Sequence, residues 1–388
     1  MMEFLLLLLP VAAASGWLAA KRSSRRHAGS SDIERNPAYF QGLNYLLNEQ
    51  PDKAIDVFVQ MLEVDSETVE THLALGNLFR RRGEVDRAIR IHQNLIARPT
   101  LSRNQRAQAL LELGQDYMRA GLYDRAENLF IELTEMNLYS EQALRNLQVI
   151  YQQEKDWDNC LSVATRLESY TDESLHIERA HYYCELAQEA INAKDYARAN
   201  AMLKRAQSSD RSCVRATILQ GDMEMARDDC KAALRAYKRV EQQDPDFISE
   251  MLPMLIDCQK RLGRQQDLVN YLRQLFVRQK NLAIVLALLD YIQEEEGDQA
   301  AVDFLTGYLH DHPSLEGLHR LIGLSQRNMD GSSAPEILSI LREQVALLLK
   351  KRSAYQCGRC GFSAKTLHWQ CPGCASWASM KPLQGIDG

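Results

Sequence analysis

Four cysteines near the C-terminus are the residues of this 388-residue chain whose type and spacing could do chemistry. They form two C-x-x-C pairs separated by ten residues, Cys357 with Cys360 and Cys371 with Cys374. Two such turns facing each other supply four thiolates at tetrahedral geometry, a ligand set that selects Zn²⁺ or a single iron ion. We therefore predict one bound metal ion, iron or zinc, held by these four cysteines.

The residues around the cysteines favour a module that the metal folds. Glycine and proline next to the thiols let the backbone bend so that N–H groups point at the sulfurs. Phe362, Trp369 and Trp377 are too few to form a core, so the metal is expected to supply the folding free energy. A dithiol redox pair and a metal-free cluster remain as alternatives. His368 is an alternative ligand that four cysteines make unnecessary.

The two turns resemble the knuckles of rubredoxin. The matching motifs are C-x-x-C-G at residues 357–361 and C-P-x-C at residues 371–374. Ala375 stands where a second glycine is usual, and the loop between the pairs is shorter than in free rubredoxins. The resemblance implies a metal site over residues 350–388, while the departures leave iron and zinc both open and argue against electron transfer.

The long segment before the ribbon must position it, and this segment is built from helical pairs. The clearest unit has two apolar-periodic runs separated by Gly121, a residue that ends helices because it enters the left-handed region without strain. Asp124 is expected to cap the second helix and to face its positive dipole end. Gly114 and Ala126 are small, which predicts a close approach of the two helices with Phe130 between them.

The same unit recurs at steps of 34 to 39 residues. Positions equivalent to Gly114 are Gly42, Gly76, Gln148, Ala187, Gly221, Ile256 and Asp290. This spacing resembles the tetratricopeptide repeat. We predict an all-α, right-handed superhelix of eight to nine helix pairs over residues 37–349, the ninth pair lying in 315–326 and 335–351. A generic helical bundle is the alternative, but it would not hold one period through eight copies.

The N-terminus predicts a membrane anchor. Residues 4–20 carry no charge and would span about 25 Å as a helix, near the lower limit for crossing a bilayer. Four basic residues follow: Lys21, Arg22, Arg25 and Arg26. The positive-inside rule then places the rest of the chain in the cytoplasm. We assign 1–20 to a transmembrane anchor and 21–36 to a basic linker. A cleaved signal peptide is the alternative, although it needs its positive charge before the apolar run.

Composition and charge exclude several classes. The chain is 45% hydrophobic and 25% charged, as globular proteins are, and its formal net charge is −6. Residues 350–388 hold six basic side chains and one acidic, so the acidic excess lies on the repeats and argues against a nucleic-acid groove there.

The histidines of the repeats show no nucleophile or acid at catalytic spacing. Cys160 and Cys230 stand at packing positions, where cysteine acts as a small hydrophobe. We expect neither an enzyme nor a disulfide-bonded protein.

The order of anchor, basic stop, repeat array and ribbon resembles the lipopolysaccharide assembly protein B family of Gram-negative bacteria over the entire chain. The resemblance implies a single-pass inner-membrane protein with the bulk of its chain in the cytoplasm. It implies an adaptor that promotes degradation of the LpxC deacetylase by the membrane protease FtsH, opposed by a LapC-type membrane regulator. Lipopolysaccharide or its transport proteins would be further partners.

Three other functions use the same parts. A scaffold that gathers lipopolysaccharide synthesis and export proteins would, when lost, lower envelope assembly without raising the deacetylase level. A metal- or redox-sensing interaction protein would lose its metal reversibly under oxidant and change its affinity for a partner. Nucleic-acid binding has the basic tail in its favour, but the acidic repeats and the membrane tether argue against it.

Overall fold

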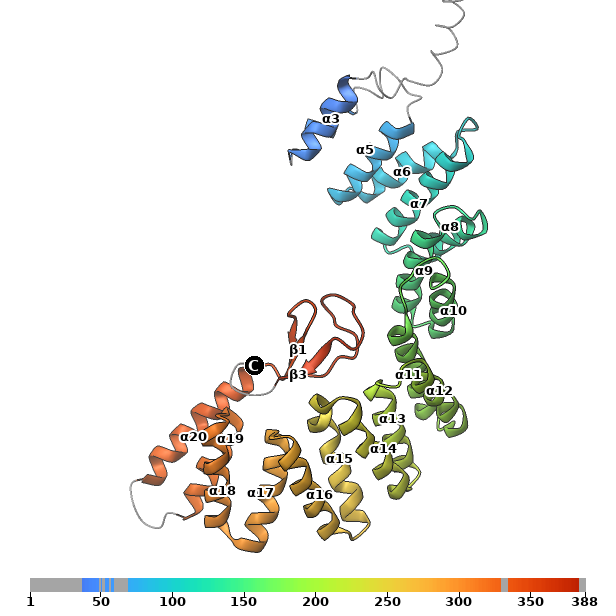
Figure 1. Cartoon of the computed structure of the whole chain (residues 1–388). Coiled ribbons are helices and arrows are strands. Elements are labelled where there is room, and N and C mark those ends of the chain that lie inside the picture. The colour runs from blue at the N-terminus through green and yellow to red at the C-terminus, as the bar shows by residue number, and fades with distance from the viewer. Residues whose placement is uncertain are drawn as a thin grey trace, which may run out of the picture. The chain divides into compact units, whose positions relative to one another are not determined.

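The computed structural model describes most of the chain after the predicted anchor and linker. The described residues are 37–48, 50, 53–55, 57–58, 69–328 and 334–383. The anchor predicted for residues 1–20 and the linker at 21–36 lie outside them. No described helix combines the length and apolar character needed to cross a bilayer. The chain divides into two compact units, residues 1–150 and 151–388 (Figure 1).

The first unit consists of helices that pack against their neighbours in sequence. Its described helices are α3 (Pro37–Leu47), α5 (Val69–Arg81), α6 (Val85–Ile96), α7 (Arg103–Arg119), α8 (Tyr123–Glu135) and the greater part of α9 (Ser140–Glu154). Helix α5 contacts α6, α6 contacts α7, and α5 also contacts α7 one repeat further on. This nearest-neighbour pattern is that of a helical repeat array, as the period predicted.

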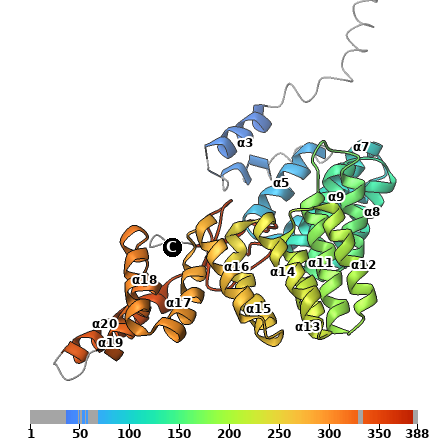
Figure 2. The ribbon, with the colours of Figure 1, turned by 60° about the horizontal axis from the view of Figure 1, so that its bottom comes forward.

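The second unit continues the pattern and ends in the ribbon. Its helices are α10 (Trp157–Leu167), α11 (His176–Asn192), α12 (Tyr196–Ser209), α13 (Val214–Ala226), α14 (Cys230–Gln243), the 3₁₀ turn η2 (Pro245–Phe247), α15 (Ile248–Arg261), α16 (Gln265–Arg278), α17 (Leu282–Glu296), α18 (Asp298–Asp311), α19 (Leu315–Asn328) and α20 (Ala334–Lys351). The last two helices confirm the ninth pair. Figure 2 shows α13 to α16 lying side by side within this unit.

A glycine of the first helix lies under a ring of the second helix in four repeats. The pairs, each sixteen residues apart, are Gly42 with Phe58, Gly76 with His92, Gly114 with Phe130, and Gly221 with Tyr237. A Cβ atom added at Gly114 would lie 2.6 Å from the Phe130 ring, closer than side-chain packing allows. The repeated small residue is therefore a packing requirement, and this part of the sequence prediction is confirmed.

The helix boundaries confirm one turn prediction and correct another. Gly121 has φ +75°, the left-handed conformation expected of a helix stop. The capping role predicted for Asp124 is wrong, because α8 begins after Leu122 and Asp124 lies inside its first turn, without a capping hydrogen bond. Asp156 does cap its helix, accepting a hydrogen bond from the Asn159 N–H. The capping aspartates directly precede the first helical residue, also at Asp195 and Asp229.

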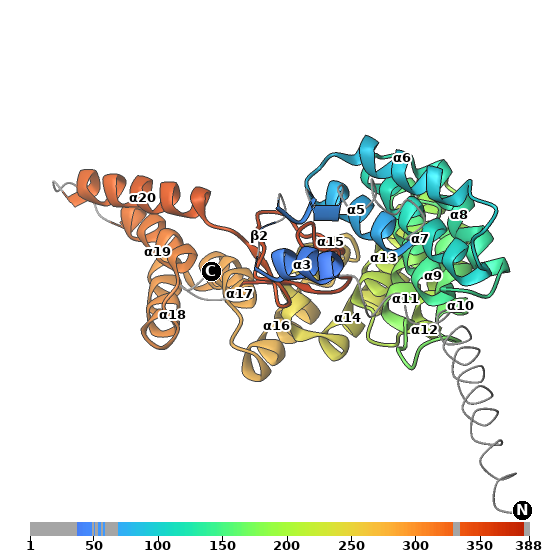
Figure 3. The same ribbon diagram turned by 90° about the horizontal axis from the view of Figure 1, so that it is seen from above.

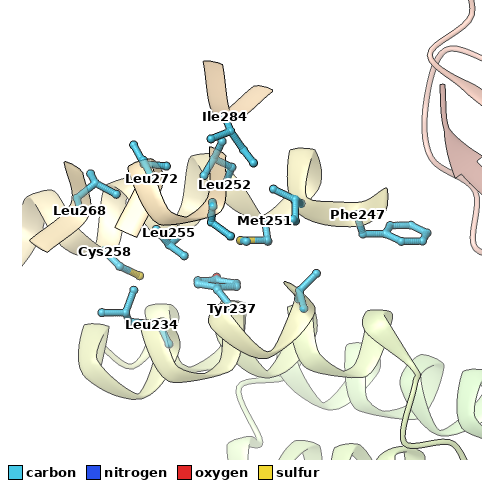
Figure 4. Packing of buried hydrophobic residues seen from close by; sticks show 14 of the residues in the cluster. Leu234, Tyr237, Phe247, Met251, Leu252, Leu255, Cys258, Leu268, Leu272 and Ile284 are labelled. Carbon is cyan, nitrogen blue, oxygen red and sulfur yellow. The ribbon is translucent and has the colours of Figure 1, made fainter. Parts of the chain in front are cut away.

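The core of the second unit is continuous from α13 to α17. Tyr237, Met251, Leu255 and Leu272 are all fully buried in it. Figure 4 shows these side chains between the helices, with Phe247 at the edge pointing toward the C-terminal ribbon. Phe247 is therefore the member of the repeat core that faces the ribbon.

The ribbon is a three-stranded antiparallel sheet with the order β2-β1-β3. Its strands are β1 (Tyr355–Cys357), β2 (Ser363–Ala364) and β3 (Met380–Pro382). Tyr355 pairs with Ala364 on one side and with Pro382 on the other. In Figure 1 the ribbon lies on the inner side of the curve that α11 to α20 follow within the second unit.

Replacing Gly221 by alanine is predicted to destabilise the second unit. The new Cβ would collide with the Tyr237 ring, and overpacking of this kind costs about 1–3 kcal/mol. Urea unfolding of the purified chain would measure the change. Gly307→Ala is the matched control, because nothing lies within 4 Å of its added Cβ on an exposed helical position, and it should raise stability by up to about 1 kcal/mol. Equal effects at both positions would contradict the packing argument.

Candidate metal centre and its interface with the repeats

The structure brings the four predicted cysteines together. Their Sγ atoms all lie within 4.8 Å of one another. Cys357 Sγ is 3.8 Å from Cys374 Sγ, and Cys360 Sγ is 3.6 Å from Cys371 Sγ. Four thiolates bound tetrahedrally at zinc–sulfur distances of about 2.3 Å lie about 3.8 Å apart, so this donor set fits one ion of that size.

Each C-x-x-C pair is held by the same backbone turn. The Gly361 N–H donates to the Cys357 carbonyl at 2.9 Å, and the Ala375 N–H donates to the Cys371 carbonyl at 2.8 Å. Both turn residues are left-handed, Gly361 with φ +77° and Ala375 with φ +55°. Ala375 occupies the position where the motif usually has glycine, so its Cβ adds backbone strain that the rest of the ribbon must offset.

Donors around two of the sulfurs stabilise thiolate charge. Cys357 Sγ lies 3.3 Å from Ser379 Oγ and accepts a hydrogen bond from the Arg359 N–H at 3.4 Å. The hydroxyl of Ser379 contributes most to lowering the pKa of Cys357 to about 6. Ser376 likewise lowers the pKa of Cys374, whose Sγ is 3.4 Å from its hydroxyl oxygen. These donors fit a site that binds a cation through thiolates.

Cys360 titrates in the opposite direction. A hydrogen bond from the Phe362 N–H lowers its pKa, but desolvation and the neighbouring thiols outweigh it and raise the pKa to about 12. Because the four thiols lie close together, they cannot all ionise easily without a cation, and a bound cation would displace the remaining protons. Metal affinity consequently decreases as the pH falls, because each ligand must lose its proton. His368 lies outside the four-cysteine group identified among the described residues.

Two tryptophans of the ribbon pack against helices far away in sequence. Trp369 stacks on Phe247 with ring centroids 5.5 Å apart. Trp377 stacks on His181 at 5.1 Å and meets Trp157 edge-on at 6.2 Å. We call these five residues the ribbon interface. Through these tryptophans the ribbon reaches η2, α11 and α10, and its Lys365 Nζ also donates to the Lys350 carbonyl at the end of α20 at 2.7 Å. A short linker after α20 therefore does not confine the ribbon to the nearest repeat.

Polar contacts surround the ribbon interface. The Tyr355 hydroxyl donates to Glu250 Oε1 at 2.9 Å, and Gln370 Nε2 donates to Gln152 Oε1 at 2.9 Å. Lys381 Nζ lies 2.8 Å from Asp246 Oδ2 and is paired also with Asp244. The basic ribbon is thus matched to acidic repeat residues, which explains part of the charge asymmetry of the sequence.

The contact of His181 with the ribbon is the feature of the site that sequence reasoning missed. His181 is buried, and burial followed by the charge of Arg215 lowers its pKa to about 3. Neither His181 Nδ1 nor Trp377 Nε1 has a hydrogen-bond partner among the described residues. The neutral imidazole therefore serves as an aromatic surface for Trp377. No local pattern reveals this, because the partners are 196 residues apart in the sequence.

Two further buried contacts had no sequence signal. In the first unit, His92 Nδ1 lies 2.5 Å from Asp116 Oδ2, and Arg80 bonds the other Asp116 oxygen at 2.8 Å. His92 therefore packs its ring over Gly76 and also makes a buried polar contact with the next helix. In the second unit, the Sγ atoms of Cys184 and Cys213 are 3.9 Å apart as free thiols. The sequence had shown no pairing among the cysteines of the repeats.

Helical repeats joined to a four-cysteine knuckle ribbon define the class: a tetratricopeptide-repeat protein with a rubredoxin-type metal-binding tail. Family models of known proteins agree with this class. A rubredoxin metal binding domain model matches residues 355–382, and tetratricopeptide repeat models match residues 71–106 and 184–246. A solved tetratricopeptide repeat protein from Parabacteroides merdae is 16% identical with a TM-score of 0.33, covering 61% of this chain and 89% of that one.

Full-length relatives identify the family. The chain is 40% identical over 388 residues to lipopolysaccharide assembly protein B of Escherichia coli K12, covering all of both chains. It is 35% identical over 396 residues to lipopolysaccharide assembly protein B of Haemophilus influenzae Rd, again covering all of both. The chain belongs to the lipopolysaccharide assembly protein B family. The matched models describe repeats and a metal ribbon, and we identified no catalytic domain among the described residues.

Replacing Cys371 by serine is predicted to remove the metal and to release the ribbon together. Cys371 is buried, and its thiolate is one of four that the cation would need. Elemental analysis should show loss of the ion, and tryptophan fluorescence should shift to longer wavelength as Trp369 and Trp377 become exposed. Cys160→Ser, at a buried repeat position, should leave metal content unchanged. A metal-free ribbon that keeps native fluorescence would contradict the metal's structural role.

The ribbon interface is predicted to weaken in acid because of His181. Its pKa is about 3 when buried and near 6.5 when exposed, so the exposed state binds more protons between these values. Stability is fully present above pH 6.5 and falls by up to about 1.4 kcal/mol per pH unit below it. Chemical unfolding of the ribbon followed by tryptophan fluorescence at several pH values would measure the slope.

The matched variants for this measurement lie on the same helix. His181→Phe keeps an aromatic surface and should flatten the slope, leaving the part due to the thiolates. His176→Phe, at an exposed position of α11, should keep the full slope. An unchanged slope in His181→Phe would mean that another group carries the pH dependence.

Proposed function

We propose that this protein is a non-enzymatic adaptor of lipopolysaccharide assembly, tethered to the inner membrane and facing the cytoplasm. It presents the deacetylase LpxC to the membrane protease FtsH and so limits lipopolysaccharide synthesis, with a LapC-type membrane protein opposing it. Lipopolysaccharide or its transport proteins are further candidate partners. The single observation that carries the proposal is the full-length identity to relatives named for lipopolysaccharide assembly.

The physical parts of the chain support an adaptor. Tetratricopeptide repeats offer an extended surface for protein partners, and repeat models match residues 71–106 and 184–246 of this chain. The ribbon, described over residues 355–383, adds a second surface, held against the repeats by the ribbon interface. We infer that Cys357, Cys360, Cys371 and Cys374 hold one iron or zinc ion and that the ion maintains this docked arrangement.

The anchor gives the adaptor its physical advantage. Residues 1–20 would cross the membrane once, and residues 21–36 would keep the repeats at the cytoplasmic surface. Confinement near the membrane raises the effective concentration of the repeats toward a membrane protease by orders of magnitude without adding any contact. An adaptor can therefore work with modest affinities for each partner.

Removing residues 1–20 is predicted to uncouple the repeats from the protease. Crosslinked pull-downs from membranes should recover FtsH and LpxC with the intact chain and lose FtsH with the truncated one. The half-life of LpxC in cells carrying only the truncated chain should increase several-fold. As the control, an unrelated single transmembrane helix fused to residue 21 should restore turnover if the anchor only tethers.

The alternative functions predict other outcomes. Normal LpxC turnover with the truncated chain would end the adaptor proposal. Reduced envelope assembly with an unchanged LpxC level would favour the scaffold that coordinates lipopolysaccharide synthesis and export. Reversible metal loss under oxidant, with a matching change in partner affinity, would favour the metal- or redox-sensing protein.

A further inference from the structure

The last helix of the repeat array has an apolar surface that nothing in the described structure covers. Helix α20 packs on α19 through Val345, which is buried. Beside this contact, five aliphatic side chains are between 48% and 61% exposed: Ile337, Ile340, Leu341, Leu347 and Leu348. Figure 3 places α20 beyond α19 at the end of the unit. A terminal repeat normally needs a polar outer face, so this surface requires an explanation.

The exposed residues form one stripe on the helix. Taken with Gln344 and Lys351, which are also exposed, they follow the i, i+3, i+4 and i+7 spacing of a single helical face. We call these seven residues the α20 stripe. It corresponds to the surface that a following repeat would cover, but the chain turns instead into the ribbon, which docks on η2, α11 and α10.

The α20 stripe is palindromic about Gln344. Ile340 and Leu341 lie four and three residues before it, and Leu347 and Leu348 lie three and four residues after it. Ile337 and Lys351 lie seven residues away on either side. A two-fold axis beside Gln344 therefore places each apolar pair of one helix against the other apolar pair of an antiparallel copy, as an isologous contact requires.

The polar members of the α20 stripe fit the same arrangement. The Gln344 amide has both donors and an acceptor, so it can bond to its own copy across the axis and fix the register. Lys351 would lay its aliphatic stem on Ile337 of the other chain and keep its ammonium group in water. A membrane surface suits the stripe less well, because the central amide would enter the apolar layer without a partner.

We propose that α20 pairs with α20 of a second copy of this chain, antiparallel about a two-fold axis beside Gln344. The occupant is another copy because the spacing of the stripe matches itself in reverse and no charge lies between Ile337 and Leu348 on it. The pair makes the protein a dimer through the end of its repeat array and leaves the ribbon interface free of the contact.

Cysteine crosslinking of the full chain in mild detergent tests the axis. Gln344→Cys should crosslink to its own copy in high yield. Ile337→Cys alone should not, because the two copies of residue 337 would lie about 21 Å apart along the helices. A mixture of the Ile337→Cys and Lys351→Cys chains should form the mixed crosslink. The unsubstituted chain gives the background from native cysteines such as the exposed Cys360.

The mass of the full chain tests the stripe. We expect a dimer whose dissociation constant rises at least tenfold in Leu348→Glu. Val277→Glu is the matched control: this isolated, 82% exposed residue on α16 should leave the dimer intact. Circular dichroism should show equal helix content in all variants. A monomeric unsubstituted chain, a dimer that Leu348→Glu does not weaken, no crosslink at residue 344, or lipid-vesicle binding by the stripe without dimerisation would each overturn the proposal.

Discussion

The contact of two tryptophans with the repeat helices is the interaction on which the ribbon depends. The ribbon has three very short strands and a small buried cluster that consists largely of its own cysteines and Met380. A module of this size cannot bury enough apolar area to hold itself together. By stacking Trp369 on Phe247 and Trp377 on His181, it takes part in the core of the second unit. The ribbon and the helices of the second unit therefore form one structural unit, although the sequence divides the chain into a helical array and a tail.

This arrangement links metal binding to the shape of the repeat surface. The cysteines organise the two turns, and Trp369 and Trp377 flank the second turn, directly before Gln370 and after Ser376. A cation held by four thiolates would thus fix the tryptophans in the positions that meet the helices. Metal binding and docking of the ribbon are then thermodynamically linked. The bound ion stabilises the ribbon conformation that docks, and docking stabilises the ribbon conformation that binds the ion. The covered repeat surface would become exposed if either were lost.

The parts of the fold that repeat locally could be predicted from the sequence, and those that depend on distant contacts could not. Gly114 under Phe130 and Gly121 at the helix stop follow from spacing within one unit, and the four cysteines follow from two motifs within the eighteen residues 357–374. The cap at Asp156 was missed because the repeat aligns an aspartate two residues later in the chain. His181 was missed because its partner lies 196 residues away, and burial of a neutral imidazole leaves no mark on the local pattern. A single sequence carries no record of such pairs.

The buried imidazole and the four thiols respond to acid in the same direction for different reasons. His181 opposes docking when it gains a proton, because its charge would be buried beside Arg215. The thiolates lose their affinity for a cation when they gain protons, and Cys357, whose pKa is lowered to about 6, gains its proton only in acid. Both effects favour release of the ribbon, and neither compensates for the other. An interface built from hydrophobic side chains and a neutral hydrogen-bonded pair would avoid this sensitivity. The chain instead places a titratable ring and a thiolate cluster on the two sides of one contact, so docking is firm near neutrality and conditional on the protonation state of both.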